Sequence, residues 1–100
     1  MHKHIPKSFK ILGDSYTVQQ RARPGSNFGA FQPAKRHITV HLRAPEGAVR
    51  PAADVYYTFW HEAVHAALHH MGHRLWNNEA FVSRLASRLC SITETARMPK

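Results

Sequence analysis

Residues 51–71 constrain the fold of this chain most strongly, because their pattern predicts one long amphipathic helix. Pro51 or Asp54 can begin such a helix, and Gly72 is suited to end it. Apolar side chains recur at helical spacings of three and four, at Tyr56, Trp60, Val64, Ala67, Leu68 and Met71. We therefore expect one side of this helix to pack on the rest of the protein.

The flank of this predicted helix carries an H-E-x-x-H motif at residues 61–65. His61 and His65 are four residues apart, so both imidazoles lie on one helix face and can bind the same metal ion. Glu62 projects beside that ion, where it can act as a general base. Because the chain contains 9 histidines, such a pattern can also arise by chance, and its surroundings must support it.

A catalytic zinc ion usually takes three protein ligands, so a third must come from elsewhere in the chain. His69 shares the face of the motif but lies about 12 Å from His61 along a helix axis, which makes it a neighbour of the site. Glu79 is the best candidate by spacing, although an acid in the first turn of a helix is also favoured by the helix dipole. It can reach only if the link after Gly72 runs backward or the helices cross at an angle. His73, beyond the helix end, is an alternative ligand.

The first half of the chain reads as β structure. Residues 8–12 and 16–21 suggest a hairpin around Gly13-Asp14, residues 28–31 a short strand, and residues 37–42 the clearest strand, which alternates cleanly.

A second helix is expected to start at Asn77 or Asn78 and to run to about Ala96. Its expected core face is formed by Phe81, Val82, Leu85, Leu89 and Ile92. The predicted class is α+β, with a short antiparallel N-terminal sheet followed by two helices. The length predicts a single domain spanning residues 1–100, with flexible tails at 1–7 and 97–100.

The composition limits the remaining possibilities. A net charge of +8 suits an acidic partner such as nucleic acid, but the basic residues are scattered rather than clustered. Cys90 is the single cysteine, which excludes an intramolecular disulfide and a cysteine-based zinc site. No window resembles a membrane span and the N-terminus lacks the apolar core of a secretion signal, so we expect a cytoplasmic protein without a membrane partner.

Residues 57–68, together with Gly72 and residues 77–82, resemble small zincin-type metallopeptidase domains encoded by phages and prophages. The resemblance covers roughly residues 28 to 92 and rests on the HExxH motif followed by Asn77-Asn78-Glu79 before an apolar helix. It implies a minimal zincin-like fold. It also implies that Glu79 is the third ligand.

The expected activity is Zn²⁺-dependent peptide hydrolysis, with His61, His65 and Glu79 as ligands and Glu62 as general base. Candidates for stabilising the developing oxyanion are His69, His73 and Tyr57. The substrate would be a peptide or protein, which could extend the sheet beside residues 37–42. Two alternatives remain: a non-catalytic zincin-like module, and a basic module that binds nucleic acid or a regulator.

Overall fold

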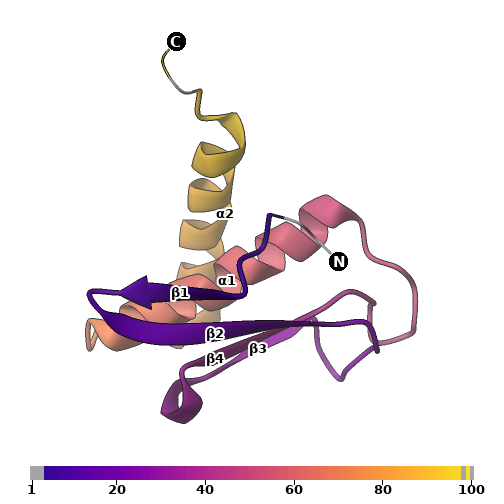
Figure 1. Cartoon of the computed structure of the whole chain (residues 1–100), viewed down its shortest axis with the longest axis horizontal. Coiled ribbons are helices and arrows are strands. Elements are labelled where there is room, and N and C mark those ends of the chain that lie inside the picture. Colours follow the sequence, from indigo (N-terminus) through magenta and orange to yellow (C-terminus); the bar gives the residue numbers. More distant parts are fainter. Residues whose placement is uncertain (1–3, 98, 100) are drawn as a thin grey trace.

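The computed structural model describes residues 4–97 and 99 and confirms the α+β class. A four-stranded sheet lies against helix α1 (Ala52–His70), and helix α2 (Glu79–Thr95) rises across α1 on the side away from the sheet (Figure 1). Within the described part of the chain, neither helix is long and apolar enough to span a membrane.

The hairpin predicted at the N-terminus is present. Strands β1 (Ser8–Ile11) and β2 (Asp14–Arg21) pair antiparallel. The two residues between them, Leu12 and Gly13, both have positive φ, at 46° and 91°. Such a pair matches the right-handed twist of the strands that it joins, which explains how a weak turn sequence makes a tight hairpin.

The rest of the sheet is formed by β3 (Gly29–Gln32), a 3-10 turn (Pro33–Lys35) and β4 (His37–His41), in the order β1-β2-β4-β3. After β2 the chain crosses to the far edge, runs back as β3, and returns as β4 between the two. β4 is therefore parallel to β2, and the sheet is mixed rather than wholly antiparallel as expected. Because β4 pairs on both sides, the expected peptide-docking edge beside residues 37–42 does not exist. The free edge next to α1 belongs to β3.

Helix α1 is covered on two sides, not on the single side that its pattern suggested. Val55, Phe59 and Ala66 join a core with the sheet residues Tyr16, Ile38 and Val40. A second apolar cluster is formed between the helices by Val64, Leu68, Val82 and Ala86. Met71, which the pattern included in the buried stripe, is 70% exposed because it lies beyond the end of the helix. Packing on two sides also buries three polar residues of α1, which are Thr58, Glu62 and His65.

The link between the helices runs backward along α1. Gly72 has φ of 69° and follows the C-cap Met71, as predicted for the helix end. The His73 amide then donates to the Leu68 carbonyl at 2.9 Å, and the Trp76 carbonyl lies 2.7 Å from His65 Nδ1. The chain has thus returned to the level of the HExxH motif before α2 begins.

Asn78 caps α2 as predicted, since its side-chain oxygen accepts a hydrogen bond of 2.9 Å from the Phe81 amide. This cap makes Glu79 the first helical residue of α2. The start of α2 therefore presents the Glu79 carboxylate directly to α1.

The ordered core begins inside the segment predicted as an N-terminal tail. Ile5 is buried in the core, and the Lys7 carbonyl accepts a hydrogen bond of 2.9 Å from the Val18 amide. Residues 1–3, 98 and 100 of the two predicted tails lie outside the described residues. Nothing in the local sequence marks Ile5 as buried, because its partners are distant in the chain.

Two truncations of similar chemistry should separate this burial from exposure. Ile5 is 5% exposed and Leu12 is 93% exposed. We expect Ile5→Ala to lower the free energy of unfolding by about 2–5 kcal/mol, because it removes a buried side chain, and Leu12→Ala to change it by less than about 0.5 kcal/mol. Urea denaturation followed by circular dichroism measures both. Equal effects would contradict the packing of the N-terminal segment.

Candidate metal centre

Three side chains converge where α1 meets the start of α2. His61 Nε2 and His65 Nε2 lie 2.9 and 3.0 Å from the two carboxylate oxygens of Glu79, and 3.2 Å from each other. A tetrahedral ion with bonds of 2.0–2.2 Å spaces its ligand atoms by about 3.3 Å. The side chains of His61, His65 and Glu79 could therefore hold a metal ion.

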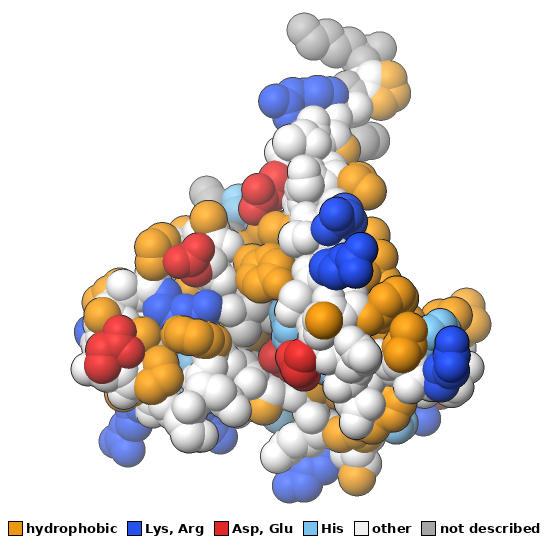
Figure 2. Space-filling model, turned by 180° about the vertical axis from the view of Figure 1, so that it is seen from behind, with side chains coloured by type: hydrophobic (Ala, Val, Ile, Leu, Met, Phe, Trp, Pro, Cys, Tyr) orange, Lys and Arg blue, Asp and Glu red, His pale blue; other side chains and the backbone are white. Residues whose placement is uncertain are grey.

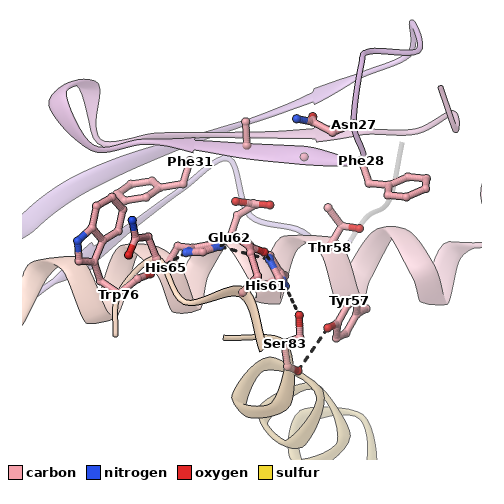
Figure 3. A pocket seen from close by; sticks show the side chains of 14 residues that line it. Asn27, Phe28, Phe31, Tyr57, Thr58, His61, Glu62, His65, Trp76 and Ser83 are labelled. Carbon is pink, nitrogen blue, oxygen red and sulfur yellow. Dashed lines mark hydrogen bonds and ion pairs between the residues drawn. The ribbon is translucent and has the colours of Figure 1, made fainter. Parts of the chain in front are cut away.

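The remaining ring nitrogens of both histidines point to the protein. His65 Nδ1 donates to the Trp76 carbonyl, and His61 Nδ1 lies 3.4 Å from the Ser83 hydroxyl (Figure 3). Since a carbonyl only accepts, the first contact places the proton of His65 on Nδ1 and leaves its Nε2 lone pair for an ion, and the Ser83 hydroxyl can accept from His61 Nδ1 in the same way. Both imidazoles are thus oriented as metal ligands usually are.

Ser83 was not identified from the sequence, although a signal was available. It lies four residues after Glu79 and so shares the face of α2 that meets the HExxH motif. The Trp76 carbonyl had no such signal, because a backbone group in a link has no residue type to search for.

Glu62 stands apart from the three ligand candidates. Its side chain points from α1 toward β3, and the residue is only 7% exposed (Figure 3). Burial, with a smaller contribution from the charge of Glu79, raises the pKa of the Glu62 carboxyl to about 7. The residue expected to act as a base is therefore held beside the centre without joining it.

A cavity of about 620 Å³ opens over the centre, between β3 and the two helices. Phe31 and Trp76 lie at one end of it, and Phe28 and Tyr57 lie at the other (Figure 3). His61, Glu62, His65, Glu79 and Ser83 all line it between these ends. The motif thus faces a cleft whose opposite wall is an edge strand.

The three candidates for a further hydrogen-bond donor lie in different places. Tyr57 lines the cavity, and its hydroxyl donates to the Ser83 carbonyl at 3.3 Å. His69 is exposed and packs on Trp76, at 4.8 Å between ring centroids. His73 stacks on Phe81, and its Nδ1 accepts from the Leu75 amide, so it is not part of the ligand cluster.

Comparisons of this chain with protein-family models, with curated proteins and with solved structures found no match. The centre is accordingly defined by its own geometry. Two imidazole nitrogens and one carboxylate meet, and the buried carboxyl of Glu62 lies beside them.

Gly29 permits the close approach of β3 to α1. A Cβ atom at this position would lie 2.7 Å from Thr58 Cγ2 and 3.0 Å from the Thr39 carbonyl oxygen. It would also lie 3.3 Å from Glu62 Oε2. The distance between the edge strand and the motif therefore depends on the absence of a side chain here.

Gly29→Ala should destabilise the protein by about 1–3 kcal/mol, because it overpacks this contact. Thr58→Ser removes the nearest methyl group while keeping the hydroxyl, so the double variant should recover part of that loss. Thermal unfolding of both single variants and the double variant tests the coupling. A double variant no more stable than additivity predicts would contradict this packing.

Metal binding can be tested without any substrate. We expect the protein to bind about one equivalent of Zn²⁺ and to gain thermal stability, since an ion that binds only the folded state stabilises it. His61→Ala should abolish both effects. His37→Ala, which changes a histidine on the opposite face of the sheet, should leave them intact. Calorimetric titration gives the stoichiometry, and equal binding by His61→Ala would reject this ligand set.

Proposed function

We propose that the protein is a zinc-dependent peptide hydrolase of zincin type. The observation that carries the proposal is the convergence of His61, His65 and Glu79 beside a buried Glu62, at the floor of an open cleft. The resemblance to phage and prophage metallopeptidase domains supports the same reading and suggests a phage or prophage origin.

The donor set favours zinc chemistry. Two neutral imidazoles and one carboxylate would leave a bound ion with net positive charge and with a coordination position for water. When bound there, Zn²⁺ would supply the Lewis acidity that activates a water molecule and polarises the scissile carbonyl. The hydrogen bond from His65 to the Trp76 carbonyl and the contact of His61 with Ser83 hold both rings in place for that task.

Glu62 is the proposed general base. Its carboxylate takes a proton from the attacking water and later passes it to the leaving amine. Glu62 is buried and does not belong to the group of three side chains that could hold the ion, which leaves it free for proton transfer rather than for ligation. Of the three candidate oxyanion donors, Tyr57 is the one that lines the cavity.

The edge strand β3 gives the substrate a place to bind. It forms one wall of the cleft, and its outer edge is not paired with another strand among the described residues. An extended peptide that paired with this edge would lie across the centre. Its backbone would then be fixed beside Glu62 while its side chains alternate between the cleft and solvent.

Glu62→Gln tests the proposed chemistry. The amide cannot accept the proton, so hydrolysis of a fluorogenic peptide library by the zinc-loaded protein should fall roughly 10²–10⁴-fold. Zinc binding should stay near one equivalent, because Glu62 is not a ligand. Glu94→Gln, on the distal part of α2, is the matched control and should retain activity.

Undiminished cleavage by the Glu62→Gln variant would reject the mechanism. No cleavage by the zinc-loaded wild-type protein, with zinc still bound, would instead favour the non-catalytic zincin-like module. The two outcomes differ in the wild-type measurement, so one set of assays separates them.

A further inference from the structure

A second cavity, of about 440 Å³, adjoins the cavity over His61, His65 and Glu79, which is called the metal cleft below. Phe28, Tyr57 and Thr58 line both spaces, so the cleft continues past the centre toward the start of α1. The outer cavity is formed by the turn at residues 44–51 and the first turns of α1. A peptide lying along β3 would reach it with a side chain on the Phe28 side of the centre.

Part of the wall of the outer cavity is apolar and exposed. Phe28 and Val49 are 50% and 71% exposed, and both line this one space. Single exposed apolar residues are ordinary, but their grouping at a cavity indicates a contact surface. Ala44, Ala48 and Pro51 add to the apolar part of the wall. Such a surface suits the aliphatic part of a long side chain.

Two carboxylates, Glu46 and Asp54, also line the outer cavity. Neither side chain lies within salt-bridge distance of a cationic group in the described part of the chain, although the charge of Asp54 acts on nearby Arg50. Four of the six acidic residues of this protein line the two connected cavities, although its net charge is +8. Figure 2 shows acidic side chains across the left and centre of this face, with most Lys and Arg side chains below them and along α2. The cleft therefore differs in charge from the rest of the surface.

Arg50 lines the outer cavity as well, but its guanidinium is fixed to the protein. It donates to the carbonyls of His41 and Asp54 and to the Thr58 hydroxyl, and it lies over the Phe28 ring. Burial lowers the pKa of the Arg50 guanidinium, and the nearby charge of Asp54 partly offsets this by favouring the protonated form. Arg50 is thus part of the wall, and Glu46 is the carboxylate with the greater freedom to meet a ligand.

We propose that the outer cavity binds a lysine or arginine side chain of the peptide that crosses the metal centre. The aliphatic stem would lie on Phe28 and Val49, and the cationic end would meet Glu46 and Asp54. This inference rests on the proposed function, because that function is what places a peptide in the cleft. It adds a substrate class, a peptide with a basic residue on the Phe28 side of the scissile bond.

Three matched peptides test the inference. Each is an acetylated, amidated alanine pentapeptide that carries lysine, norleucine or glutamate at its centre. Norleucine has the aliphatic stem of lysine without its charge. Titration into zinc-loaded Glu62→Gln protein, followed by amide chemical shifts in NMR spectra, should show the lysine peptide binding about two- to fivefold more tightly than the norleucine peptide. The shifts should include Glu46 and Val49.

Glu46→Gln and Asp54→Asn should each reduce this preference for lysine while leaving the affinity for norleucine unchanged. Both residues are exposed, so both variants are expected to fold. Glu94→Gln, which removes a carboxylate elsewhere, should keep the preference. Equal affinity for lysine and norleucine in the parent protein, or a preference that survives both substitutions, would overturn the inference.

Binding of a basic side chain in the outer cavity can be tested separately from peptide hydrolysis. Mass spectrometry of each peptide after incubation with the zinc-loaded wild-type protein reports cleavage independently. A lysine preference in binding with every peptide intact would leave the outer cavity assigned and reject hydrolysis. Cleavage without any preference for the basic peptide would support hydrolysis and reject the proposed role of the outer cavity.

Discussion

The packing of α1 between the sheet and α2 is the constraint on which the rest of the structure depends. The sheet covers one side of the helix through Val55 and Phe59, and α2 covers another through Val64 and Leu68. A helix held on two sides cannot rotate about its axis, so the side chains between those contacts have fixed directions. That is how Glu62 comes to face β3 while His61 and His65 face α2.

Local features of the fold were predictable because their causes lie within a few residues. Gly72 ends α1 and Asn78 caps α2 as their chemistry demands. The order of the strands was not predictable, because alternation tells which face of a strand is buried but not which strand lies beside it. The parallel β2–β4 pair follows from the path of the chain between them, which has no local signature. The burial of Ile5 depends on distant partners in the same way.

The residues of the site also differ in whether their positions have a local cause in the sequence. His61 and His65 are brought together by the pitch of one helix, which the sequence states directly. The choice of Glu79 as the third ligand depended on the resemblance to a known family. Its approach to the histidines depends on a link that reverses along α1, and no residue pattern describes such a path. Gly29 could not be identified as a site residue from the sequence, because its contribution is the space that it leaves for Thr58 and Glu62.

The separation of the ligands along the chain has one more consequence. His61 and Glu79 are 18 residues apart, on two helices joined by the reversed link. An ion bound to both would close that loop as a reversible crosslink, which lowers the entropy cost of keeping α2 docked. A domain of 100 residues has a small core, so such a crosslink would contribute a sizeable share of its stability. The lifetime of the folded protein would then follow the supply of the ion in its surroundings, whether or not a substrate is present.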